Sequence, residues 1–263
     1  MNSMDQVFQK GKAFIPFITA GDPNLAITEQ LVYRMAEAGA DLIELGIPFS
    51  DPIAEGPVIQ AADVRALEAG TTTDHIFDMV ERIRQSCDIP IAFMTYVNPV
   101  FTYGTEPFMK RCRKAGVNAL IVPDVPYEER EELMPYSKQY GVPLISMIAP
   151  TSEERIPMIA KEAEGFLYCV SSLGVTGTRS ELGGDAKEMI RRVKEHSHVP
   201  CAVGFGIHSP EQAAKVAEYA DGIIVGSAIV RIVEQYGTDC VQKVEEYVRN
   251  MIAAIGSRNR CTE

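Results

Sequence analysis

The segment AEAGADLIELG at residues 36–46 recurs in outline as KAGVNALIVPD at residues 114–124 and as AEYADGIIVGS at residues 217–227. In each segment a small residue stands near the end of a helical pattern, an Asp, Asn or Gly follows, and a short apolar run closes the segment. An apolar run after such a break is typical of a buried strand. Three similar joints from helix to strand predict a chain built of repeated strand–helix units.

Apolar runs of this kind occur at eight places along the chain, and we expect them to be its strands. They are nearly continuous in apolar residues, as expected for parallel strands that are covered on both faces. The predicted strands are 13–19, 41–46, 91–96, 118–123, 143–148, 166–171, 201–205 and 222–226. The longer stretches between them are amphipathic, which predicts helices.

Eight strand–helix units in about 250 residues match the size of a (β/α)8 barrel. No Pro-, Gly- or Ser-rich linker divides the chain, so we expect a single (β/α)8 TIM barrel over residues 1–263 rather than two domains. Two helices, 57–69 and 73–87, are predicted between the second and third strands. A short extra helix, 228–235, is predicted after the eighth strand and before a terminal helix at 240–255. Phosphate-binding barrels hold their anion at such a short extra helix.

The composition excludes several classes of protein. The 263 residues carry a formal net charge of −11, which argues against a nucleic-acid partner. No apolar run approaches the length of about 18 residues that spans a membrane, and the polar N-terminus lacks the apolar core of a signal peptide. We therefore expect a cytoplasmic protein. The six cysteines form no C-x-x-C pair and the four histidines do not cluster, so we expect no metal.

Glycines follow the last two strands, at the end of a barrel where functional groups belong. Gly204-Phe205-Gly206-Ile207 comes after the seventh strand, and Gly226-Ser227-Ala228 comes after the eighth. Tight turns that close a barrel would also favour glycine. The two glycine pairs together, leading into the extra helix, favour a phosphate held by backbone N–H groups. After the sixth strand, the glycine-rich segment SSLGVTGTRSELGGD at 171–185 predicts a lid that closes over the substrate.

Glu44 lies near the end of the otherwise apolar second strand, and Glu55 follows in the next loop. A buried salt bridge would explain Glu44, but no Lys or Arg lies in any predicted strand to supply it, so an acid or base is favoured. The absence of a lysine at a strand end disfavours a Schiff-base aldolase. The first strand is not followed by a dinucleotide-binding fingerprint. These observations predict a cofactor-free acid/base reaction on a phosphate ester, in which two carboxylates divide the roles.

The segment IELGIPFSDPIAEGP at residues 43–57 closely resembles the signature of the tryptophan synthase alpha chain family. Four further segments match this family in the same order along the chain: FIPFITAGDP at 14–23, GVTG at 174–177, GFGI at 204–207 and GSAIV at 226–230. The resemblance implies the retro-aldol cleavage of indole-3-glycerol phosphate to indole and glyceraldehyde 3-phosphate. It also implies that Glu44 is the general acid/base at the indole C3 and the glycerol hydroxyl. Glu55 then takes the place of the second carboxylate, which accepts a hydrogen bond from the indole N–H; the family more often has Asp there.

The resemblance assigns the other site residues by position. Phe17, Tyr96, Ile121 and Tyr168 match positions that line the indole pocket, and Tyr168 also matches a position that orients Glu44. Gly177, Phe205, Gly206, Gly226 and Ser227 match the phosphate cradle, Thr176 lies in the lid, and Asp124 and Asn98 match other positions at the barrel mouth.

The resemblance also implies a partner. Members of the family bind a pyridoxal-phosphate beta chain in an αββα assembly and pass indole to it, so this chain itself is expected to need no cofactor. Residues 48–57 and 171–185 resemble the elements that sense the partner, and the isolated chain is expected to be slow. Three alternatives stay open: a stand-alone indole-glycerol-phosphate lyase, a catalytically weak subunit that mainly activates its beta chain, and another phosphate-binding barrel isomerase. Glu at position 55 is what keeps the second of these open.

Overall fold

A computed structural model of the chain describes residues 4–170, 184–204 and 206–256. Its eight strands form one sheet in the order β4-β3-β2-β1-β8-β7-β6-β5, and every pair of neighbours is parallel. The strands are β1 Ala13–Thr19, β2 Ile43–Gly46, β3 Ile91–Met94, β4 Ala119–Ile121, β5 Ser146–Ile148, β6 Leu167–Val170, β7 Cys201–Gly204 and β8 Gly222–Val225. Each strand lies within a run predicted from the sequence, so the TIM barrel is confirmed.

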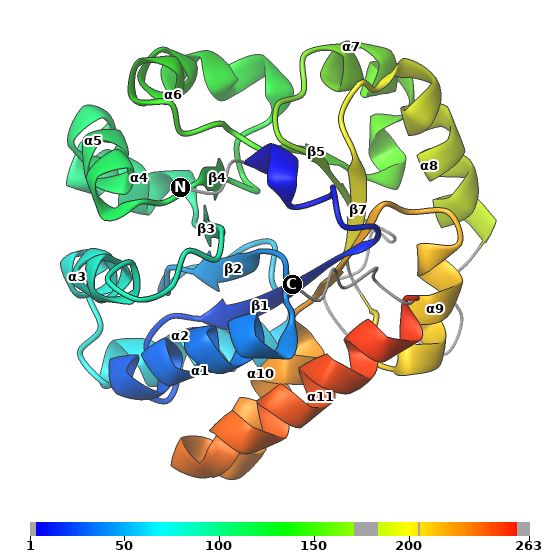
Figure 1. Cartoon of the computed structure of the whole chain (residues 1–263). Helices are drawn as coiled ribbons and strands as arrows, with labels where there is room; N and C mark the ends of the chain where they lie inside the picture. The colour runs from blue at the N-terminus through cyan, green and yellow to red at the C-terminus, as the bar shows by residue number, and fades with distance from the viewer. Residues whose placement is uncertain (1–3, 171–183, 205, 257–263) are drawn as a thin grey trace.

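The sheet curls until its two end strands meet. A parallel bridge joins Leu120 of β4 to Leu144, just before β5. Two backbone hydrogen bonds of 2.9 Å make this contact, from Leu120 N to Pro143 O and from Ile145 N to Leu120 O. Figure 1 shows the helices around the outside of the ring of strands. Both faces of the sheet are therefore buried, which explains why the strands are continuous apolar runs.

The helices follow the predicted order with one addition. They are α1 Leu25–Ala38, α2 Pro57–Glu68, α3 Thr73–Ile83, α4 Val97–Tyr103, α5 Thr105–Ala115, α6 Met134–Tyr140, α7 Ile156–Lys161, α8 Gly184–His196, α9 Pro210–Ala217, α10 Ser227–Tyr236 and α11 Cys240–Ala254. Short 3₁₀ turns, η1 to η4, lie at Met4–Gln6, Tyr127–Glu132, Pro150–Arg155 and Gly237–Asp239.

The two helices between β2 and β3 and the extra helix after β8 are present as expected. Helix α4 was not predicted, because Pro99 interrupts the helical pattern and Tyr96 at its N-cap makes no side-chain capping bond. Helix α8 begins at Gly184, so the last two residues of the predicted lid segment belong to a helix instead.

The recurring helix-to-strand joints have a physical role at the N-terminal ends of the strands. In each joint the polar residue before an even-numbered strand accepts a hydrogen bond from the backbone N–H at the start of the strand before it. We call these bonds the strand caps: Phe14 N to Asp41 Oδ2 at 2.8 Å, Ile91 N to Asn118 Oδ1 at 3.0 Å and Cys201 N to Asp221 Oδ2 at 3.0 Å. Each satisfies a backbone donor that would otherwise lack a partner at the edge of the ring.

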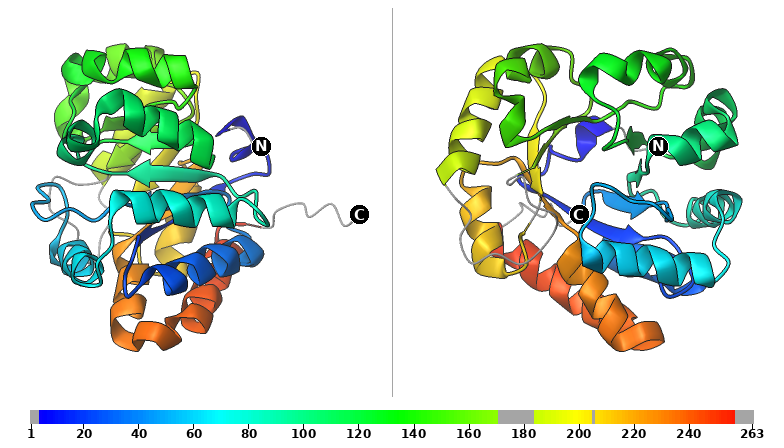
Figure 2. Two further views of the ribbon diagram at one scale, coloured as in Figure 1. Left: turned by 90° about the vertical axis from the view of Figure 1, so that its left-hand side faces the viewer. Right: turned by 180° about the vertical axis from the view of Figure 1, so that it is seen from behind.

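The inside of the barrel is a packed apolar core. Small and large side chains alternate in it, from Ala13, Ala92 and Ala202 to Ile15, Ile121 and Phe166. Met4 and Val7 join this core and cover the end of the barrel at which the strands begin. The left view of Figure 2 shows this N-terminal segment on the side of the barrel opposite the loop between β2 and α2. The opposite end of the barrel, where the carboxyl ends of the strands meet, is the end at which barrels of this kind carry their functional sites.

Among the described residues, no helix is both long and apolar enough to cross a membrane.

Candidate active site

A small pocket lies at the carboxyl ends of the strands, inside the barrel mouth. It brings together seven of the residues singled out in the sequence: Phe17, Glu44, Glu55, Tyr168, Gly206, Gly226 and Ser227. They come from β1, β2, β6 and the segments after β2, β7 and β8, so only the closed barrel brings them together. The rest of its lining is mostly apolar: Ala54, Ile59, Met94, Pro123, Met147, Ile207, His208, Ile224 and Ala228.

Glu44 is the buried carboxyl of this pocket. It pairs in register with Phe17 of β1 and Ala92 of β3, and its residue is only 1% exposed. Its Oε2 has no hydrogen-bond partner among the described residues, so no salt bridge neutralises it there. Burial, and secondarily the charge of Glu55, raise the pKa of Glu44 to about 8. The side chain therefore carries its proton at neutral pH, and it lines the pocket with one oxygen that has no partner among the described residues.

Glu55 is held by a different environment. The Tyr96 hydroxyl donates a hydrogen bond to Glu55 Oε2 and accepts one from Ala54 N–H at 2.8 Å. Burial raises the pKa of Glu55, the bond from Tyr96 opposes this rise, and the charge of Asp124 adds to it. The two carboxyls of one pocket thus have different surroundings, and of the two only Glu55 accepts a hydrogen bond from a hydroxyl.

Two aromatic side chains reach the pocket because glycines leave room for them. A Cβ atom on Gly46 would lie 2.7 Å from Phe17 Cζ, and one on Gly204 would lie 2.6 Å from the Tyr168 hydroxyl. Such contacts are too short for any side chain larger than hydrogen. Tyr168 is buried, and burial followed by the charge of Glu44 raises its pKa. The aromatic walls of the pocket therefore depend on these two strand glycines.

The opposite side of the pocket is built of backbone. Gly226 is the N-cap of α10, and its carbonyl accepts hydrogen bonds from Ile229 N and Val230 N at 2.8 and 3.1 Å. The first N–H groups of a helix have no partner within it, so those of Ser227 and Ala228 are available to an anion. Gly206 has a φ of 79°, which favours glycine. These features fit the predicted phosphate position.

The remaining predicted residues lie elsewhere. Ile121 is fully buried inside the barrel, and Asp124 accepts a hydrogen bond from Val97 N–H at 3.0 Å. Asn98 is exposed on α4, where it accepts a bond from the Thr102 hydroxyl at 3.4 Å. Thr176, Gly177, Phe205 and residues 171–183 of the predicted lid lie outside the described residues.

Two polar residues near the site were not predicted from the sequence. Asp63 is only 5% exposed on the inner face of α2; burial, and secondarily the charge of Glu55, raise its pKa to about 8. Its position in the apolar stripe with Ile59, Ala62 and Ala66 could have revealed it. His208 lines the pocket and directly follows the GFGI segment, which was its signal.

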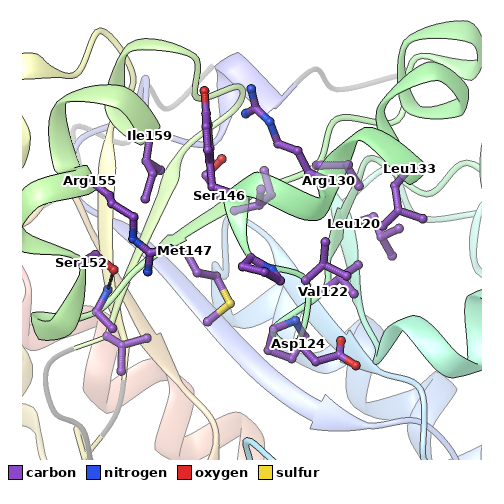
Figure 3. Close-up of a pocket in the computed structure, with 18 of the residues that line it drawn as sticks. Leu120, Val122, Asp124, Arg130, Leu133, Ser146, Met147, Ser152, Arg155 and Ile159 are labelled. Carbon is purple, nitrogen blue, oxygen red and sulfur yellow. Dashed lines mark hydrogen bonds between the residues drawn. The ribbon is translucent and has the colours of Figure 1, made fainter.

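A larger cavity, of about 450 Å³, lies beside this pocket between the β4–β5 seam and the turns η2 and η3. Figure 3 shows Arg130 and Arg155 on opposite sides of it. Arg130 is paired with Glu162 and Arg155 with Glu128, so neither guanidinium is left for a phosphate. Glu44 and Glu55 line the smaller pocket and not this cavity. The smaller pocket is therefore the candidate active site.

Comparison with known proteins decides the family, since the model of the tryptophan synthase alpha chain family matches residues 4–256. The chain belongs to this family. It is 46% identical over 260 residues to the tryptophan synthase alpha chain of Lacticaseibacillus casei, which covers 99% of this chain and 98% of that one. It is 52% identical over 225 residues to the alpha chain of Halalkalibacterium halodurans, with 85% of each chain covered.

Solved structures of the family agree. Tryptophan synthase subunit alpha from Legionella pneumophila str. Paris has a TM-score of 0.89 at 38% identity, covering 97% of this chain and 98% of that chain. A tryptophan synthase complex from Pyrococcus furiosus has a TM-score of 0.85 at 32% identity, covering 92% of this chain and 98% of that chain. The family resemblance read from the sequence is thus confirmed. Across residues 4–170, 184–204 and 206–256, no three His, Cys, Asp or Glu side chains are grouped as a metal ion would require.

Proposed function

We propose that this chain cleaves indole-3-glycerol phosphate to indole and glyceraldehyde 3-phosphate, as a lyase of tryptophan biosynthesis. The observation that carries the proposal is Glu44, a buried carboxyl with a free oxygen, in a pocket that also holds the N-terminus of α10. The apolar and aromatic lining suits an indole ring, and the helix N-terminus suits a phosphate.

Glu44 supplies both proton transfers of the reaction. Its pKa of about 8 keeps it protonated near neutral pH, so it can donate a proton to C3 of the indole. The resulting carboxylate takes the proton of the hydroxyl on the adjacent glycerol carbon. The C–C bond then breaks, its electron pair returns to the indole ring, and the glycerol carbon becomes the aldehyde. One proton has moved from oxygen to carbon, and Glu44 ends as it began.

Glu55 stabilises the charge that develops on the ring. Protonation at C3 places positive charge on the indole nitrogen, and a carboxylate that accepts the N–H hydrogen bond lowers the energy of this intermediate. The Tyr96 hydroxyl, which itself accepts a hydrogen bond from Ala54 N–H, holds the Glu55 side chain. This side chain is one methylene longer than the Asp that the family more often has there.

We further propose a beta chain carrying pyridoxal phosphate as the partner, in an αββα assembly, with no cofactor in this chain. The similar structure from Pyrococcus furiosus is that of a tryptophan synthase complex, which supports such a partner. The segment between β2 and α2 holds Glu55, so a protein that binds this segment would act directly on the site.

The test is indole formation by the full chain, with and without a beta chain. Glu44→Gln is expected to lose nearly all activity because it cannot exchange a proton, whereas Glu55→Asp is expected to retain or improve it. Glu68, exposed at the end of α2, gives the control Glu68→Gln with unchanged activity. Full activity without a beta chain would favour a stand-alone lyase, and no cleavage under any condition would favour a subunit that mainly activates its partner. An active Glu44→Gln variant would refute the mechanism.

A further inference from the structure

The described lining of the pocket contains no Lys or Arg. Glu55 is an acidic group in this lining, and the whole chain has a net charge of −11. The proposed substrate brings a phosphate into this field, and backbone N–H groups supply only partial positive charge. Among the described lining residues, the one side chain that can become a cation is His208.

His208 is held firmly in its place by three contacts. Its backbone N–H donates to Gln212 Oε1 at 2.9 Å, and its carbonyl accepts from the Tyr247 hydroxyl at 3.0 Å. Its ring Nδ1 lies 2.9 Å from the carbonyl oxygen of Gly206. These contacts come from the β7–α9 segment, from α9 and from α11, so the position of the ring is set before any ligand arrives.

The contact to Gly206 also fixes which ring nitrogen is available. A carbonyl can only accept a hydrogen bond, so Nδ1 must carry the hydrogen in this arrangement. The other nitrogen, Nε2, is then the one left to bond a ligand. His208 lines the pocket together with Gly206, Gly226 and Ser227, which form its backbone side.

We propose that His208 is a phosphate-binding residue of this site, which donates a charged hydrogen bond from Nε2 to the phosphate of the substrate. With a hydrogen on both ring nitrogens, the imidazole supplies the positive charge that the rest of the described lining lacks. This inference rests on the proposed function, because it takes the phosphate ester as the ligand. It adds a residue that selects for the phosphate group rather than for indole.

The test compares His208→Gln with His208→Lys in the full chain. Gln fills a similar volume without charge, whereas Lys restores a cation. A charged hydrogen bond at a half-buried position predicts a rise in KM of about 10-fold for Gln. Its kcat should stay within about twofold, because His208 does not touch the reacting carbon. For Lys, we expect KM to stay within about threefold of the unchanged protein.

A second measurement separates the phosphate from the ring. Inhibition by glycerol 3-phosphate should weaken about 10-fold in His208→Gln, in parallel with KM, whereas binding of free indole should not change. His75→Gln is the matched control: His75 is exposed on α3, and its Nδ1 also lies near a backbone carbonyl, that of Gly70, at 3.2 Å. It does not line the pocket, so neither constant should move.

The outcome distinguishes this inference from the proposed function. Equal effects of Gln and Lys, or an unchanged glycerol 3-phosphate constant in His208→Gln, would overturn the role of His208. If the chain forms no indole at all, the proposed function fails, but calorimetric titration with glycerol 3-phosphate still decides the inference. Binding that weakens in His208→Gln and recovers in His208→Lys supports it, and absence of binding to the unchanged protein overturns it.

Discussion

Replacing Glu44 by Gln should make the protein more stable while abolishing the proposed reaction. In the unfolded chain this carboxyl loses its proton above pH 4.5, whereas in the folded barrel it keeps the proton up to about pH 8. The folded state therefore binds one more proton over this range, so stability falls as the pH rises through it. Each pH unit above 4.5 lowers the free energy of unfolding by about 1.4 kcal/mol, so that about 3 kcal/mol has been lost at pH 7. Gln has nearly the same shape and does not titrate.

The assay is urea unfolding of both proteins at several pH values from 4 to 8.5. We expect the two to have similar free energies of unfolding at pH 4, where Glu44 is protonated in both states. As the pH rises, the free energy of unfolding of Glu44→Gln should increasingly exceed that of the unchanged protein, by about 3 kcal/mol at pH 7 and about 5 kcal/mol above pH 8. The exposed control Glu68→Gln should change stability by no more than about 0.5 kcal/mol at every pH.

A difference between the two proteins that stays constant from pH 5 to 8 would refute this reasoning. It would mean that Glu44 is already ionised in the folded barrel. The proposed proton donation to the indole ring would then lose its donor. Stability and activity are thus linked through one buried carboxyl, as expected where a site is strained for its function.

Three further substitutions test other contacts. Gly204→Ala should lower both indole formation and stability, the latter by about 1–3 kcal/mol in urea unfolding, because the new methyl group displaces the buried ring of Tyr168. Asp63→Asn should stabilise the protein at pH 8 by about 5 kcal/mol and have little effect at pH 4, as the raised pKa of this buried carboxyl requires. Arg65→Met should lower the free energy of unfolding by about 3 kcal/mol. It removes the guanidinium that binds both carboxylate oxygens of Asp22, whose side chain is only 2% exposed, and a calorimetric unfolding scan would detect the loss.

Most of the fold could be predicted because parallel strands covered on both faces leave a strong signal. All eight apolar runs contain strands, and the predicted run 13–19 matches β1 residue for residue. The run 143–148 is too long because its first part only bridges to β4 at Leu144. Helix α4 was missed because its start lacks a side-chain cap and Pro99 lies within it. Errors thus fall at places where tertiary contacts, and not local pattern, decide the structure.

The site was predictable as far as its residues lie at strand ends. Glu44, Phe17 and Tyr168 reach one pocket because strand ends converge in any such barrel. The hydrogen bond from Tyr96 to Glu55 could not be predicted, since it joins two segments 41 residues apart. The apolar stripe of α2 indicates that Asp63 is buried, but the rise in its pKa could not be predicted, because it depends on how α2 packs against the barrel mouth.

The strand caps have a consequence for how sequences of this kind can diverge. Two of them use Asp and one uses Asn, so the structure needs an acceptor oxygen at these positions and not a charge. They lie at the N-terminal ends of the strands, away from the loops that carry the chemistry. Substitutions in the loops at the barrel mouth that change substrate preference therefore leave the strand caps unchanged. Substitutions that change specificity and substitutions that change stability can therefore accumulate independently in evolution, because they lie at opposite ends of the same barrel.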